Sequence, residues 1–213
     1  MNTCTVAGID VGGDKKGCHL VILEGSRAFR PPATKTPQEM LQACLEYGVE
    51  AVGIDAPCQW SVEGEGRLAE RELARQRIFS FATPTRKRAD ENPARFYQWM
   101  FKGEEIYEVF SFSYPLLRSR EFQGERVSFE TFPHAVTCAL RGKDGTSAKE
   151  KRRQRPKVLE DVNIDVTGLK SIDDFDAALC ALSARYLLEG QTYAYGDVKG
   201  GFIHVPIPSP TNT

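Results

Sequence analysis

This sequence lacks the features that would assign a protein to a membrane, to secretion or to a nucleic-acid complex on composition alone. No stretch approaches the roughly 20 consecutive apolar residues of a membrane span. The N-terminus has no charged leader before a long apolar run, so we expect no signal peptide. The formal net charge is −1, and any nucleic-acid partner must therefore be met by a local patch of charge.

Paired cysteines are missing as well. The six cysteines are scattered along the chain without a C-x-x-C spacing. This distribution favours buried, reduced thiols in a cytoplasmic protein over a disulfide framework.

The composition that is present is that of an ordinary soluble globular protein. The 213 residues are 41% hydrophobic and 27% charged, which is enough to bury a substantial core. We expect one domain over residues 1–213, with a helical insertion at 58–124 and a basic segment at 141–157.

A strand that ends in an acid occurs twice. Residues 4–11 form a short apolar strand that carries Asp10 and breaks at Gly12-Gly13, and its AGID sequence returns as VGID at 52–55. A charge among buried strands is costly unless it meets a cation or another partner. The repetition therefore indicates a shared site that contains Asp10 and Asp55.

The first part of the chain predicts how these two strands are arranged. Short connections favour an antiparallel meander of strands at 4–11, 17–23 and 27–34. A helix then starts after Thr36 and stops at Gly48, followed by a strand at 49–55. The strand–helix–strand order implies a right-handed crossover between parallel neighbours, which brings Asp10 and Asp55 to the same C-terminal sheet edge.

A glycine lies two residues before each acid, on the same face of its strand. Gly8 and Gly53 leave room above the sheet for another group to approach.

Together with the strand at 126–131, these strands form a mixed five-stranded sheet with 4–11 central and parallel to 49–55. We expect a charged helix at 67–79, a loop at 84–88, an aromatic helical stretch at about 93–112, a strand at 126–131 bearing Glu130, a short helix from Pro133 to Arg141, a long helix at 171–190, a strand at 192–195 and a proline-rich end.

The aromatic stretch contains a cluster of large side chains. We expect core or lid packing for these residues, because stacking on nucleic acid needs exposed rings in a basic groove. They are Phe96, Tyr97, Trp99, Met100 and Phe101.

Residues 141–157 contain eight basic and two acidic residues. Such a run is either a solvated, mobile face or a flank of the acid site that contacts phosphates. In the second case the candidate nucleic-acid-binding residues are Lys15, Lys16, Arg152, Arg153 and Arg155.

The long helix adds two more acids. Asp173 and Asp176 are three residues apart and share a face on its first turn. Small residues then follow at positions 177, 180, 181 and 184, which let a helix lie tightly against a sheet. We therefore expect Asp176 to point toward the sheet.

The acids taken together suggest metal chemistry. Clustered carboxylates raise one another's pKa unless a cation joins them, and oxygen ligands without histidine or cysteine suit Mg²⁺ or Mn²⁺. Two such ions favour phosphoryl displacement, so metal-assisted phosphodiester hydrolysis is the predicted reaction. The predicted catalytic residues are Asp10, Asp55, Glu130 and Asp176. The predicted metal ligands are these four together with Asp173.

The order of elements resembles the RNase H-like fold, and a short motif resembles Holliday-junction resolvases of that superfamily. Their D-x-x-D-A-L-x-x-A helix is matched by Asp173, Asp176, Ala177 and Ala181, with Leu179 one place after the leucine of the pattern.

Further motifs resemble more closely a family of predicted nucleases of RNase H fold, domain of unknown function 429. The motifs are GID near the N-terminus, IDAP at 54–57, Glu70-Arg71 followed by Arg75, and FETFPH at 129–134, within a resemblance that spans about 5–195. The resemblance implies a nuclease of DNA or RNA that requires Mg²⁺ or Mn²⁺. Resolvase-like enzymes act as dimers, so a homodimer is also implied.

One position departs from the resolvase pattern. These enzymes often carry a glutamate on the fourth strand, where this chain has Asp55. Whether Asp55 and Glu130 both bind metal therefore stays open.

Two other functions are compatible with the sequence. GIDVGGDKKG resembles the first phosphate loop of sugar kinases in the actin-like ATPase group, although Asp14 replaces the threonine of that loop and those kinases need two domains. The chain could also be a catalytically silent nucleic-acid-binding or scaffold domain.

Overall fold

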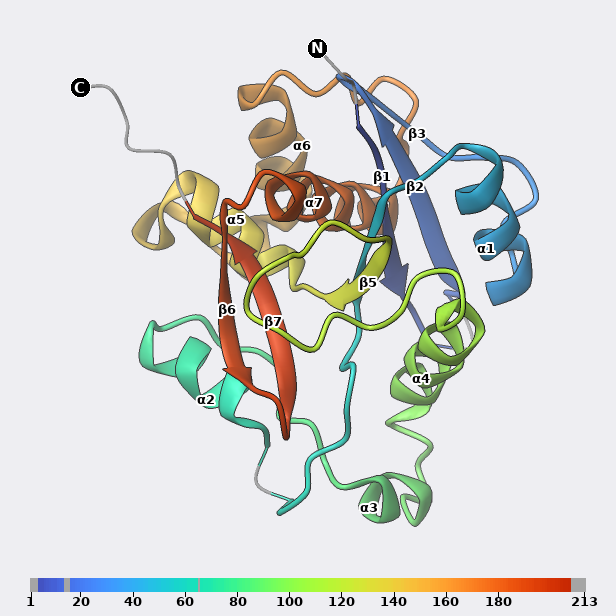
Figure 1. Cartoon of the computed structure of the whole chain (residues 1–213). Coiled ribbons are helices and arrows are strands. Elements are labelled where there is room, and N and C mark those ends of the chain that lie inside the picture. Colours follow the sequence, from blue (N-terminus) through green and yellow to red (C-terminus); the bar gives the residue numbers. More distant parts are fainter. Residues whose placement is uncertain (1–3, 14–15, 65, 208–213) are drawn as a thin grey trace.

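The protein has an α/β architecture in which helices cover both faces of one mixed sheet (Figure 1). The computed structural model describes residues 4–13, 16–64 and 66–207. The strands, in the spatial order β3-β2-β1-β4-β5-β7-β6, are β1 Thr5–Val11, β2 Cys18–Glu24, β3 Arg27–Phe29, β4 Ala51–Asp55, β5 Val127–Glu130, β6 Thr192–Asp197 and β7 Gly201–Pro206.

Seven α-helices are found in the described part of the chain. They are α1 Pro37–Glu46, α2 Leu68–Arg75, α3 Arg86–Asp90, α4 Gln98–Phe110, α5 Pro133–Arg141, α6 Lys151–Asp161 and α7 Ile172–Leu188. Figure 1 shows α1 and α4 on one side of the sheet and α5, α6 and α7 on the other. None of the described helices is long and apolar enough to cross a membrane.

The alternation of strand β1 explains why two separate cores form. Ala7 and Ile9 pack toward α1 and α4, whereas Val6 packs toward α6 and α7. Successive side chains of a strand point to opposite faces, so one strand contributes to both layers. Gly8 and Asp10, two residues apart, lie on the α7 face.

The arrangement predicted for the two acid-bearing strands is confirmed. β1 is antiparallel to β2 and parallel to β4, and Asp10 is the register partner of Asp55. The helix between them begins as predicted, because Thr36 and Glu39 form the expected capping box.

The number of strands was wrong: the sheet has seven strands, not five. The β6–β7 hairpin extends it beyond β5, and β7 pairs parallel with β5 at Glu130 and Ile203. The stretch Gly201–Pro206 is buried throughout, so it lacks the alternation that marks a half-exposed strand.

Two local predictions also need correction. β3 ends at Phe29 rather than continuing to 34, because Pro31 and Pro32 cannot donate the hydrogen bonds of a ladder. The expected loop at 84–88 contains the start of α3, whose first turn is capped by Thr85.

The space above Gly8 and Gly53 is filled by α7. A Cβ at Gly8 would lie 2.0 Å from the Ala177 carbonyl oxygen, and a Cβ at Gly53 would lie 2.4 Å from the Cys180 carbonyl oxygen. Only glycine lets the backbones approach this closely. The close contact sets the first turn of α7 beside the ends of β1 and β4.

Candidate functional site

Asp10 and Asp55 lie together at the C-terminal edge of the sheet. They are opposite each other on neighbouring parallel strands, and both follow a glycine that faces α7. Burial, with the nearby charge of Asp173, raises the pKa of Asp10 to about 6. Burial and the charge of Asp10 hold the pKa of Asp55 well above its usual range. The predicted convergence of these two carboxylates is confirmed.

The first turns of α7 bring the other two predicted aspartates. Ser171 caps this helix and forms a capping box with Asp174. Asp173 is half-buried and lies 3.4 Å from Lys16 Nζ. Asp176 is buried, with 5% of its surface exposed. Its ion-pair partners lie on α6, and its predicted orientation toward the sheet stays a prediction.

A cation of the predicted basic segment lies inside this acid cluster. Arg155 of α6 forms an ion pair with Asp176, and only 9% of its side chain is exposed. Its positive charge also lowers the pKa values of Asp10 and Asp55, although burial outweighs this effect. Burial lowers the pKa of Arg155 itself. Lys151, one turn earlier on α6, lies 4.0 Å from Asp176.

Arg152 and Arg153 lie on the other side of α6. Both are exposed, and they line a surface hollow of about 540 Å³ together with Arg141 and Lys157. Arg153 forms an ion pair with Glu150. The three arginines of the predicted basic set are therefore divided between two faces of one helix, whereas Lys16 lies beside Asp173. Lys15 lies outside the described residues.

Glu130 is not part of the aspartate cluster. It is the register partner of Ile54, so the pleat of the sheet turns it to the face opposite Asp55. Its two carboxylate oxygens accept hydrogen bonds from the Arg67 guanidinium at 2.6 and 2.7 Å, and the Cys58 N–H donates to one of them at 2.8 Å.

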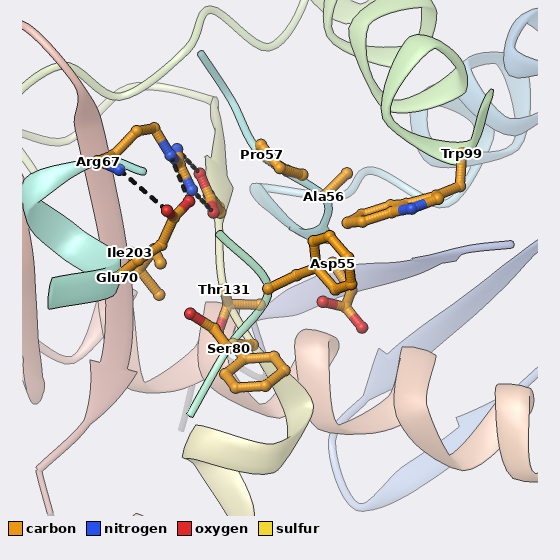
Figure 2. A pocket seen from close by; sticks show the side chains of 12 residues that line it. Asp55, Ala56, Pro57, Arg67, Glu70, Ser80, Trp99, Thr131 and Ile203 are labelled. Atoms are coloured by element: carbon orange, nitrogen blue, oxygen red, sulfur yellow. Dashed lines mark hydrogen bonds and ion pairs between the residues drawn. The ribbon is translucent and has the colours of Figure 1, made fainter. Parts of the chain in front are cut away.

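Arg67 is the centre of a buried charge network (Figure 2). Its Nε donates to Glu70 at 2.8 Å, and Glu70 also accepts a hydrogen bond from the Thr83 N–H at 3.0 Å. Arg67 and Glu70 are both buried. Burial alone would lower the pKa of Arg67, but Glu130 raises it well above its usual value. This network joins α2, the 83 loop and β5.

The sequence did not reveal the partners of Arg67, because its position at the start of a helix is also typical of an exposed arginine. Asp174 also has partners that the sequence did not reveal. Its carboxylate lies 2.9 Å from His19 Nδ1 and 3.2 Å from Arg30, so it tethers α7 to β2 as well.

A hollow of about 50 Å³ lies between the Arg67 network and Asp55. Figure 2 shows Asp55 beside the indole of Trp99, with Arg67 and Glu70 on the opposite side. Ser80 and Phe81 form part of its wall. The aspartate edge is thus bordered by an aromatic surface on the helical segment between β4 and β5.

The aspartates fit a hard divalent cation in chemistry, because their donors are carboxylate oxygens. Burial and neighbouring negative charge raise the pKa values of Asp10 and Asp55, and a bound cation opposes both effects. Within residues 4–13, 16–64 and 66–207, however, no group of three or more Asp, Glu, His or Cys side chains is arranged to hold a metal ion. The positive charge at the cluster is supplied by Arg155, Lys151 and Lys16. For a third carboxylate to bind a metal ion, Asp173 would have to release Lys16, or Asp176 would have to release Arg155.

The fold and the site define an α/β protein with a buried aspartate cluster at the C-terminal edge of a mixed sheet. The chain belongs to the family described as protein of unknown function (DUF429), whose model matches residues 8–199. This result agrees with the resemblance noted in the sequence.

No functionally curated protein matches the chain. A solved structure described as Thermus thermophilus RuvC aligns over 87% of this chain and 96% of its own, with 16% identity and a TM-score of 0.35. At this level of similarity the alignment assigns no residue and no activity.

Proposed function

We propose that this protein is a metal-dependent nuclease that hydrolyses phosphodiester bonds of DNA or RNA at the aspartate cluster. The observation that carries the proposal is the pairing of Asp10 and Asp55 at one sheet edge, where burial raises both pKa values. The charge of Asp173 raises the pKa of Asp10 further, and the charge of Asp10 raises that of Asp55. Such a pair is electrostatically unfavourable by itself, and a divalent cation relieves the repulsion.

The residues that would hold Mg²⁺ or Mn²⁺ are Asp10 and Asp55, joined by Asp173 or Asp176 from α7. A bound ion would neutralise phosphate charge and lower the pKa of a water nucleophile. Asp10 and Asp55 are on strands and α7 is fixed against them by the glycine contacts, so the backbone that carries the cluster is preorganised.

Basic residues of α6 support a polyanionic substrate. Lys151 and Arg155 border the aspartates. Once a bound metal ion replaces them as the partner of the aspartates, either can pair with a phosphate oxygen. Arg152 and Arg153 lie on the exposed face of the same helix, where they can contact phosphates further along the strand.

Cleavage and calorimetry together test the proposal. Wild type, Asp10→Asn and Asp55→Asn are incubated with branched, duplex and single-stranded DNA and RNA in Mg²⁺ or Mn²⁺, and ion binding is measured by titration calorimetry. We expect the wild type to cleave at least one of these substrates. In both variants the cleavage rate should fall at least 100-fold, as it does when a group that stabilises transition-state charge is removed, and the metal ion should bind more weakly.

Asp165→Asn is the matched control. Asp165 is an exposed aspartate beside Ser26, at the opposite end of the sheet from Asp10. The Asp165→Asn variant should therefore cleave at the wild-type rate. If the wild type cuts and the Asp10 and Asp55 variants cut equally well, the site is wrong. If the wild type neither cuts nor binds an ion, the nuclease proposal is wrong.

A further inference from the structure

Phe96, which was expected to pack in the core or in a lid, is exposed, and it lies beside Phe81, a second exposed ring. Phe81 and Phe96 have 47% and 53% of their surface exposed, whereas Met100 is buried in the core as expected. Phe81 lies at the centre of the group: its ring centroid is 5.2 Å from that of Phe96, 6.2 Å from that of Trp99 and 6.5 Å from that of Tyr97. We refer to Phe81, Phe96, Tyr97 and Trp99 as the aromatic cluster.

A surface hollow of about 430 Å³ opens on the outer side of Phe81. Tyr97 and Arg88 are among its lining residues, and it shares Ser80 and Phe81 with the smaller hollow that reaches Asp55. Figure 2 shows Ser80 and Trp99 on either side of the approach to Asp55. The two hollows are therefore neighbours, with Ser80 and Phe81 in the wall of both and Asp55 in the wall of the smaller one.

The outer hollow also contains polar groups that need a partner. Ser80 Oγ is buried and has no hydrogen-bond partner among the described residues. An unsatisfied buried hydroxyl is unfavourable, and a bound ligand can satisfy it. Arg88 is exposed, and the described part of the chain offers it no carboxylate partner.

We propose that the outer hollow binds an unpaired nucleobase of a single-stranded or branched nucleic acid. The base stacks on Phe81 beside Tyr97, a rotation of the Ser80 side chain brings Oγ to its polar edge, and Arg88 faces the adjoining phosphate. This inference rests on the proposed function, because it places the same strand across Asp10 and Asp55.

The chemistry of the hollow favours a nucleobase over an apolar peptide. Every base has an aromatic face, so stacking on Phe81 requires no particular sequence. An apolar side chain would leave Ser80 Oγ unsatisfied and would not use the charge of Arg88. A base in an intact duplex is already stacked on its neighbours, so an unpaired base is the form that fits.

Fluorescence anisotropy with a labelled single-stranded oligodeoxynucleotide in EDTA tests the inference without cleavage. Phe81→Leu keeps an apolar side chain and removes the ring, and we expect it to weaken binding by about 5- to 150-fold, the range for loss of one stacked base. Phe81→Tyr keeps the ring and should bind like the wild type. Phe112→Ala is the control, because Phe112 is 97% exposed and contributes to neither hollow.

An abasic form of the same oligonucleotide identifies the contact. Without bases to stack, wild type and Phe81→Leu should bind equally. The inference is overturned if the wild type does not bind the ordinary strand, if Phe81→Leu binds it as tightly as the wild type, or if Phe81→Leu weakens binding of both strands equally. Binding through Phe81 without metal-dependent cleavage would refute only the nuclease proposal, and cleavage without a Phe81 effect would refute only this inference.

Discussion

The surroundings of individual carboxylates predict opposite responses to the loss of a charge. Asp10 faces other aspartates, and its pKa of about 6 lies above the ordinary value of 3.8 because of burial and the charge of Asp173. The native state therefore binds this proton more readily than the unfolded state. The contribution of Asp10 to stability falls as the pH rises from about 4 to 6.

Asp10→Asn should therefore stabilise the metal-free protein at neutral pH. The expected gain in the free energy of unfolding is at most about 3 kcal/mol at pH 7.5, and it should shrink as the pH falls toward 4. Urea unfolding at several pH values in EDTA measures it, with Asp165→Asn as a variant that should show no gain. A lower stability of Asp10→Asn at pH 7.5 would contradict the assigned repulsion.

Glu130 gives the contrasting prediction. Both of its oxygens bind the buried guanidinium of Arg67, so Glu130→Gln leaves that cation with less compensation. We expect a loss of about 3 kcal/mol in the free energy of unfolding, the lower end of the cost of breaking a buried ion pair. Urea unfolding in EDTA measures this loss. If Glu130 instead belonged to a cluster of repelling metal ligands, Glu130→Gln would stabilise the protein.

At the scale of elements, helix α6 separates two kinds of basic residue. Arg152 and Arg153 are exposed, whereas Arg155 is buried against Asp176. A contact to a phosphate releases counterions, so each contact adds about one to the slope of binding against salt concentration.

Arg152→Ala and Arg153→Ala should each weaken nucleic-acid binding and reduce that slope by about one. Binding to an oligonucleotide is measured over a range of salt concentrations. Lys35→Ala, an exposed cation just before α1 on the other side of the sheet, should leave the slope unchanged. Slopes that stay at the wild-type value in both arginine variants would show that this face of α6 is only solvated.

The elements also show what the sequence could and could not predict. Alternation and capping residues predicted β1, β4, α1 and the parallel pairing of Asp10 with Asp55, because these signals are local. β7 was missed because a strand buried on both faces has no alternation. The inward position of Arg155 and the Arg67–Glu130 pair depend on packing between distant segments, which no local pattern records.

For the whole molecule, metal binding should be coupled to thermal stability. An ion that binds the folded cluster and not the unfolded chain stabilises by about 2.7 kcal/mol at 100 times its dissociation constant. For a chain of this length that gain corresponds to an increase of roughly 5–10 °C in Tm.

Thermal unfolding with Mn²⁺ and with EDTA measures this coupling. Wild type and Asp165→Asn should show the increase in Tm, and Asp10→Asn and Asp55→Asn should lose most of it. An increase of the same size in all four proteins would place the ion outside the aspartate cluster.

The contact of α7 with Gly8 and Gly53 has a consequence for mutational tolerance. Every replacement of glycine adds a Cβ, and at both positions this atom would overlap the backbone of α7. Neither position therefore has a conservative substitute, and a deep mutational scan for folded protein should reject every variant there. The same scan should accept asparagine at position 10, two residues away. Selection for folding alone would thus distinguish Gly8 and Gly53, which are needed for the packing of this sheet edge, from Asp10, whose proposed role is in metal binding.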